Sequence, residues 1–205
     1  MELVCLDLEG VLVPEIWIAF AERTGIEALR ATTRDEPDYD VLMRQRLRIL
    51  DEHKLRMDDI QEVIAGLEPL PGAIDFVSWV RERFQLVILS DTFYEFSQPL
   101  MRQLNWPTLF CHRLVTDAEG RVVDYKLRQV DPKRASVKAF HSLNYRVIAA
   151  GGSYNDTSML GEADVGILIH APQQVIDEFP QFRSVENLAA LKQAFVQASE
   201  RDITL

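Results

Sequence analysis

The chain has 205 residues, of which 32 are acidic and 22 are basic, so its formal charge at neutral pH is −10. This excess of negative charge argues against a nucleic-acid or anionic-membrane partner, because binding either one normally requires clustered Lys and Arg. A small anionic substrate is compatible only with a local basic pocket. Hydrophobic residues make up 47% of the chain, which predicts a globular protein with one main core and a small appendage.

The first predicted element is a strand over 3–8, a nearly continuous apolar run of the kind that is buried on both faces of a parallel sheet. No basic segment precedes it, and no stretch reaches the ~18 apolar residues of a membrane-spanning helix. We therefore expect a cytoplasmic protein with no membrane partner. Cys5 and Cys111 are too few for a disulfide framework, and Cys5 is expected to be a buried thiol.

The interval from 15 to 68 contains no convincing strand and is too long for a single crossover between strands. We expect it to form a helical cap domain, inserted into a core domain made of 1–14 and 69–205. The helix-like segments of this cap cover 16–23, 39–50 and 57–67.

After the cap, strand-like and helix-like segments alternate. Apolar residues spaced as on one face of a helix run from 73 to 84, and short strands flank a predicted turn at 117–120. This alternation predicts an α/β fold, a doubly wound parallel sheet with right-handed crossovers. Three further strands are expected at 86–89, 147–150 and 166–169.

Polar side chains follow the predicted strands where each strand ends. Asp7 and Glu9 follow the first strand, and Ser90 and Asp91 follow the second. A glycine-rich turn from 151 to 156 follows a later strand. The helix ahead of that strand opens with Lys133. Because ligands bind at the carboxyl edge of open α/β sheets, we expect these groups to gather there.

This set of side chains suits phosphoryl transfer. Asp7 can attack phosphorus, but a carboxylate and a phosphate repel each other, so a divalent cation is needed, and oxygen ligands favour Mg²⁺. Glu9 can protonate the leaving alcohol and later deprotonate water. Ser90 and Lys133 can hold the phosphoryl oxygens, where negative charge must be stabilised.

The order of these motifs resembles the haloacid dehalogenase-like phosphatase superfamily, and the short helical cap resembles that of its phosphoserine phosphatases. The resemblance implies a phosphatase that hydrolyses L-phosphoserine, a small phospho-amino acid, through an aspartyl-phosphate on Asp7. Glu9 would be the acid/base, with its backbone carbonyl on Mg²⁺. The segment 7–17 resembles a subgroup that also transfers the phosphoryl group to homoserine. A homodimer remains open.

The resemblance also assigns groups around the substrate. Ser90 and Lys133 match a phosphate-holding pair, and the backbone amide of Asp91 is expected beside them. Asn155 matches a residue near the phosphate. For the amino acid, the resemblance assigns Glu15 to the ammonium and Arg46 to the carboxylate, while Tyr39 is a candidate for closing the cap.

One position departs from the family pattern. Gly152 occupies the place of an Asp that ligates the metal directly in relatives. Either Asp156 or water fills this position and the enzyme acts, or the chain is a catalytically impaired variant that still binds a phospho-amino acid.

Structural roles compete with several of these assignments. Asn155 and Asp156 could instead cap the helix that follows, and Arg46 belongs to a basic run that is by default a solvated helix face. The four histidines lack metal-ligand spacing and are expected at the surface or in the core; they are His53, His112, His141 and His170.

Overall fold

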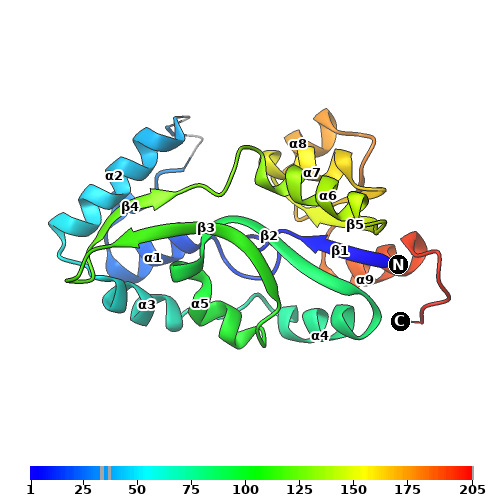
Figure 1. Cartoon of the computed structure of the whole chain (residues 1–205), viewed down its shortest axis with the longest axis horizontal. Coiled ribbons are helices and arrows are strands. Elements are labelled where there is room, and N and C mark those ends of the chain that lie inside the picture. The colour runs from blue at the N-terminus through cyan, green and yellow to red at the C-terminus, as the bar shows by residue number, and fades with distance from the viewer. Residues whose placement is uncertain (33–34, 37, 205) are drawn as a thin grey trace.

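A computed structural model describes residues 1–32, 35–36 and 38–204. Its described residues form a seven-stranded sheet in the order β4-β3-β2-β1-β5-β6-β7, with β4 antiparallel to β3 and the other neighbours parallel. Figure 1 shows helices on both faces of this sheet. The predicted doubly wound α/β fold is confirmed. The strands are β1 (Glu2–Leu6), β2 (Gln85–Phe93), β3 (Thr108–Thr116), β4 (Val122–Lys126), β5 (Arg146–Gly151), β6 (Val165–Ile169) and β7 (Arg183–Val185).

Helices connect these strands, and the predicted helical pattern from 73 to 84 is one of them. The α-helices are α1 (Ile16–Thr24), α2 (Tyr39–Glu52), α3 (Met57–Ala65), α4 (Ala73–Arg83), α5 (Tyr94–Gln103), α6 (Pro132–Ser142), α7 (Thr157–Glu162), α8 (Gln173–Glu178) and α9 (Leu188–Ala198). The described part of the chain also contains two 3₁₀ turns, η1 (Glu27–Arg30) and η2 (Tyr154–Asp156).

Strand β1 divides the core into two layers because its successive side chains point to opposite faces. Val4 and Leu6 belong to a cluster that contains Phe76 of α4 and Phe195 of α9. The alternate residues Leu3 and Cys5 belong to a second cluster, which contains Val137 of α6 and Met159 of α7. Both faces of β1 are therefore covered, as its nearly continuous apolar sequence predicts.

The block between β1 and α4 is helical, with α1, α2 and α3 close to their predicted ranges. Helix α2 lies over β4 in Figure 1, joined to it by a hydrogen bond from Tyr125 to Asp40 (2.6 Å) and an ion pair between Arg44 and Asp124 (2.8 Å). The strands around the predicted turn at 117–120 are β3 and β4, and β3 is longer than expected. The division into a cap domain and a core domain stays a prediction.

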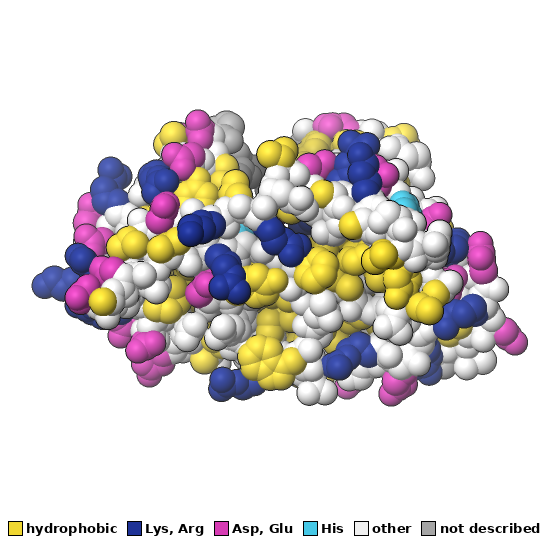
Figure 2. All heavy atoms as spheres, in the orientation of Figure 1, with side chains coloured by type: hydrophobic (Ala, Val, Ile, Leu, Met, Phe, Trp, Pro, Cys, Tyr) yellow, Lys and Arg dark blue, Asp and Glu magenta, His cyan; other side chains and the backbone are white. Residues whose placement is uncertain are grey.

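The face of the molecule in Figure 2 has basic side chains scattered among acidic ones. A notch in its outline separates the part that carries α2 from the part that carries α6, α7 and α8. Within the described residues, no helix combines the length and apolar composition needed to cross a membrane.

Candidate active site

Asp7 lies directly beyond the carboxyl end of β1, the central strand. Its amide donates to the carbonyl of Ala150 on β5 (3.0 Å), so the pairing of the two strands continues through this residue. The whole residue is only 6% exposed. The backbone therefore fixes Asp7 at the edge of the sheet where a ligand is expected.

Lys133 brings the ends of three segments together. It lies in the first turn of α6, behind a proline that suits this position, and is 2% exposed. Its Nζ lies 2.8 Å from Oδ1 of Asp7, 2.7 Å from Oδ1 of Asp156 and 3.8 Å from Oδ2 of Asp91. One buried ammonium thus faces three carboxylates, which leaves an excess of negative charge.

This excess changes the proton affinities of the cluster. Burial and the neighbouring Asp156 raise the pKa of Asp7 well above its ordinary value, against the opposing effect of Lys133. Burial would lower the pKa of Lys133, but the carboxylates of Asp156, Asp7 and Asp91 outweigh it and raise the pKa. The lysine is therefore a permanent cation, and the cluster can accept further positive charge.

Ser90 and Asp91 lie where strand β2 departs from regular pairing with β3. Between the pairs Leu89–Phe110 and Phe93–His112, β2 has three residues and β3 has one. Extra residues in one strand bend it and redirect its side chains. The hydroxyl of buried Ser90 accepts from a backbone amide in this irregular stretch (3.2 Å), while the side chain of Asp91 is 34% exposed beside Lys133.

Glu9 lies in the turn between β1 and α1. Its Oε2 accepts from the amide of Ile16 at the start of α1 (3.0 Å), and Gly10 next to it has φ +74°. Burial and the nearby Glu15 raise the pKa of Glu9 to about 7. A carboxyl with such a pKa can both give and take a proton near neutral pH.

Arg46 enters the same region from α2. It is 7% exposed, its guanidinium lies 4.5 Å from the centre of the Trp17 ring, and one terminal nitrogen donates to the carbonyl of Ala31 (2.8 Å). Its Nε is buried without a hydrogen-bond partner. Burial lowers the pKa of Arg46 to about 10, opposed by Tyr39, Glu9 and other acidic groups close by. A buried guanidinium with an unused donor is suited to an anionic ligand.

Comparison with known proteins identifies the group to which this arrangement belongs. A model of haloacid dehalogenase-like hydrolases matches residues 1–164. The chain belongs to this family. The resemblance drawn from the four motifs is therefore confirmed. The structure also brings Asp7 and Lys133 into contact.

Two bacterial members of the haloacid dehalogenase-like hydrolases are similar to the whole chain. A protein of Pseudomonas syringae pv. tomato named phosphoserine phosphatase is 72% identical over 205 residues, which are all of this chain and 86% of the relative. A protein of Pseudomonas aeruginosa named phosphoserine phosphatase ThrH is 71% identical over 205 residues, with full coverage of both chains.

Solved structures support the fold of this hydrolase. An apo phosphoserine phosphatase matches with a TM-score of 0.75 and 18% identity, over 94% of this chain and 98% of that one. A substrate-bound phosphoserine phosphatase complex matches with a TM-score of 0.76 and 18% identity, over 94% of this chain and 97% of that one.

Asp156 has partners for both of its oxygens and is fully buried. Oδ1 accepts from Lys133, while Oδ2 accepts from the amides of Gly152 and Ser153 at 2.9 Å each and from the Ser153 hydroxyl at 2.9 Å. These contacts favour a role in holding the turn and the lysine over direct ligation of a metal. Close packing explains the glycine at 151, where a Cβ would lie 2.4 Å from the Asp156 side chain.

Asn155 contributes to the site through a different neighbour. Its side-chain amide donates to Oδ2 of Asp91 at 2.6 Å, which ties the turn after β5 to the end of β2. The predicted site residues on three strand ends and on α6 thus meet. Glu15, Tyr39 and Arg46 each interact electrostatically with Glu9.

Sequence reasoning did not assign His112 to the site. The residue is 4% exposed on β3, and its Nε2 lies 3.6 Å from Oδ1 of Asp91. No motif contains it, because its position depends on the irregular pairing of β2 with β3. Its nearness to an exposed carboxylate could be found only from the folded chain.

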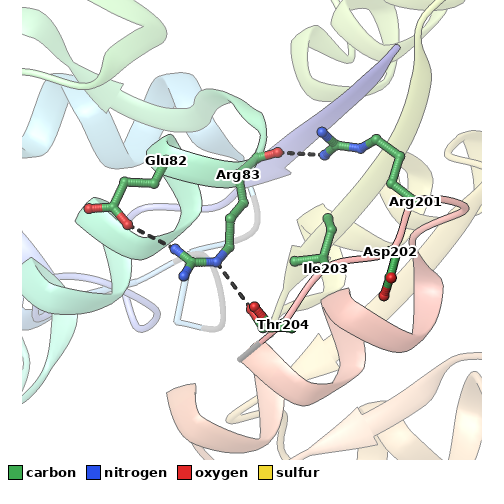
Figure 3. A pocket seen from close by; sticks show the side chains of 6 residues that line it. All are labelled: Glu82, Arg83, Arg201, Asp202, Ile203 and Thr204. Carbon is green, nitrogen blue, oxygen red and sulfur yellow. Dashed lines mark hydrogen bonds and ion pairs between the residues drawn. The ribbon is translucent and has the colours of Figure 1, made fainter.

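A groove of about 380 Å³ lies away from this cluster, at the other end of the sheet. Figure 3 shows that its arginines are engaged: Arg83 contacts Glu82 and the carbonyl of Thr204, and Arg201 contacts the carbonyl of Arg83. These contacts fasten the carboxyl-terminal segment and leave the groove without a free cation among its labelled residues.

Proposed function

We propose that this haloacid dehalogenase-like hydrolase is a Mg²⁺-dependent phosphatase that hydrolyses L-phosphoserine. The observation that carries the proposal is the buried contact between Asp7 and Lys133, a possible nucleophile beside a cation that can hold a phosphoryl group. The names of the two bacterial relatives support the substrate.

In the first step, an Asp7 oxygen forms a bond to phosphorus while the bond from phosphorus to the serine oxygen breaks. Glu9 gives its proton to the leaving alkoxide, and the product is an aspartyl-phosphate and serine. In the second step, water attacks phosphorus, Glu9 takes the proton from that water, and the carboxylate of Asp7 leaves. The raised pKa of Glu9, about 7, supports both roles.

Ser90 and Lys133 would hold the phosphoryl oxygens during both steps. The Lys133 ammonium is already in place, so it need not be reorganised when charge develops on the transferring group. The Ser90 hydroxyl accepts from the amide of Thr92 and donates to no other group among the described residues, so it can donate to a phosphoryl oxygen.

The charge of the cluster favours a divalent cation, although within the described residues no group of three or more His, Cys, Asp or Glu side chains is arranged to hold a metal ion. Three carboxylates face one ammonium, and oxygen ligands suit Mg²⁺. The carboxylate of Asp7 and the backbone carbonyl of Glu9 would hold the ion, while Gly152 offers no side chain. When bound, the ion would reduce the repulsion between the Asp7 carboxylate and the phosphoryl group.

We propose that 15–68 acts as the cap and supplies recognition of the amino acid. Arg46 can grip the α-carboxylate because its buried guanidinium has an unused Nε donor. Glu15 would accept from the ammonium, and Tyr39 lies close enough to Arg46 for the two to interact electrostatically. Cytoplasmic location and homodimerisation stay predictions from the sequence.

Transfer of the phosphoryl group from Asp7 to homoserine is a second proposed activity, supported by the sequence resemblance over 7–17. It is tested by adding homoserine to the phosphoserine reaction and measuring phosphohomoserine. A non-catalytic binder is not favoured, because Asp7 and Lys133 are both present and in contact and close relatives are named as phosphatases.

The decisive experiment is a phosphate-release screen over phosphorylated amino acids and sugars at high Mg²⁺, with wild type and Asp7→Asn side by side. Phosphoserine should be the preferred substrate, and Asp7→Asn should reduce turnover by at least about 10³-fold. Mass spectrometry of the rapidly quenched wild type should find the phosphoryl group on Asp7. Phosphate release by Asp7→Asn at the wild-type rate would refute the mechanism.

A further inference from the structure

Three carboxylates compete for the donors of one lysine. Lys133 has three N–H donors, and two of them are used at hydrogen-bond distance by Asp7 (2.8 Å) and Asp156 (2.7 Å). Asp91 is the third anion, but its nearer oxygen stays 3.8 Å away. A direct charge-assisted hydrogen bond between a carboxylate and an ammonium is about 2.8 Å long, so Asp91 makes an ion pair with Lys133 but no direct hydrogen bond.

Two other side chains lie close to the carboxylate of Asp91, one at each of its oxygens. Asn155 donates to Oδ2 at 2.6 Å, and Nε2 of His112 lies 3.6 Å from Oδ1. The contact with His112, the charge of Lys133 and the hydrogen bond from Asn155 together outweigh burial and lower the pKa of Asp91 to about 2. Asp91 is therefore an anion at every pH at which the enzyme would work.

The orientation of His112 is itself fixed by the backbone. Its Nδ1 accepts from the amide of Arg128 at 3.1 Å, so in this arrangement the ring proton is on Nε2, the nitrogen that faces Asp91. His112 is 4% exposed and sits opposite Phe93 in the β2–β3 pairing, next to the irregular stretch that carries Asp91.

We propose that His112 is a positioning residue which, with Asn155, keeps the Asp91 carboxylate off Lys133 and so reserves the third N–H of the lysine for a phosphoryl oxygen. This inference rests on the proposed function, since it assigns the reserved donor to the phosphate of the substrate. The backbone amide of Asp91 can still assist the same group. Only the side chain of Asp91 has to be kept away from Lys133.

If His112 no longer holds Oδ1, Asp91 can close onto Lys133 and compete with phosphate. The matched variants are His112→Asn, whose side-chain oxygen can still accept from the Arg128 amide but which cannot reach Asp91, and His112→Gln, which keeps a donor near the position of Nε2. Asp91→Asn removes the competing charge in either background.

The experiment measures phosphoserine kinetics and the binding of inorganic phosphate by calorimetry, both with Mg²⁺ present. His112→Asn should raise the KM for phosphoserine and the Kd for inorganic phosphate together, by about 5- to 30-fold, with kcat changed less than about twofold. His112→Gln should stay near wild type. The double variant His112→Asn/Asp91→Asn should match Asp91→Asn alone.

Equal effects of His112→Asn and His112→Gln, a fall in kcat with unchanged KM, or additive effects in the double variant would each overturn the inference. Failure of the proposed function gives a different result. If wild type binds inorganic phosphate but does not hydrolyse phosphoserine, the substrate is wrong, and the phosphate Kd values still decide the role of His112. A wild type that binds no phosphate would overturn both.

Discussion

A Cβ atom on Gly152 would lie 2.3 Å from the carbonyl oxygen of Ile169 at the end of β6. In the family pattern this position carries an aspartate that ligates the metal. The backbone of β6 therefore occupies the space that such a side chain needs, and restoring the aspartate requires β6 to move.

This relationship predicts two separable effects of substitution. Gly152→Ala and Gly152→Asp should both lower the free energy of unfolding by about 1–3 kcal/mol, because each forces the backbone at Ile169 to shift. Gly152→Asp alone should also lower the Mg²⁺ concentration for half-maximal activity. Thermal unfolding and a Mg²⁺ titration measure the two effects, and an equal Mg²⁺ requirement in both variants would remove this position from the metal site.

Asp7 and Asp156 should differ in their contributions to stability. Asp156→Asn should lower the free energy of unfolding by about 3–5 kcal/mol, since it removes a charge that pairs with Lys133 in a fully buried site. Asp7→Asn should raise the free energy of unfolding by about 1 kcal/mol, because the substitution relieves electrostatic repulsion among the buried carboxylates. Chemical denaturation in EDTA checks both values, and destabilisation by Asp7→Asn would contradict the excess of negative charge.

Arg46 should discriminate substrates by their carboxylate. Arg46→Ala should reduce kcat/KM for phosphoserine by roughly 10²-fold, which is the effect expected from the loss of hydrogen bonds between charged groups. The loss should be much smaller for phosphoethanolamine, which lacks the carboxylate. Arg48→Ala on the exposed side of α2, where Arg48 pairs with Glu52, is the control and should change neither value. Equal losses for the two substrates would exclude the recognition role.

The lowered pKa of Glu2 predicts that the free energy of unfolding depends on pH. Burial would raise its pKa, but the Ser199 hydroxyl, the Glu200 amide and Arg201 outweigh burial and hold the pKa below its ordinary value. Its stabilisation is thus complete above the pKa of the unfolded chain and is lost as the pH falls through the lower pKa of the folded chain. Glu2→Gln should cost about 1–3 kcal/mol at neutral pH.

The difference between wild type and Glu2→Gln should shrink in acid, as equilibrium unfolding across the pH range would show. The control is Glu200→Gln, which removes an exposed ion pair with Arg146 and should cost less than about 1 kcal/mol. A constant difference at all pH values would contradict the lowered pKa of Glu2.

The sequence predicts well those features that follow from strand ends. Asp7 meets Lys133 because Asp7 follows β1, and Lys133 opens the helix that leads into β5, the neighbour of β1. This inference needs only the order of the elements. Other contacts depend on strand register, on an irregular strand pairing and on loop geometry. They are the hydrogen bonds to both oxygens of buried Asp156, the contact of His112 with Asp91, and the carbonyl that faces Gly152. The spacing of apolar residues in the sequence does not predict such contacts.

The middle position of β1 also has a consequence for biosynthesis. The strand that precedes Asp7, the proposed nucleophile, is translated before both of its neighbours, Gln85–Phe93 on one side and Arg146–Gly151 on the other. Its second neighbour, β5, is translated only after β2, β3 and β4, so the proposed reaction centre cannot assemble before then. Nascent chains stalled before β5 should therefore be unable to form the proposed aspartyl-phosphate.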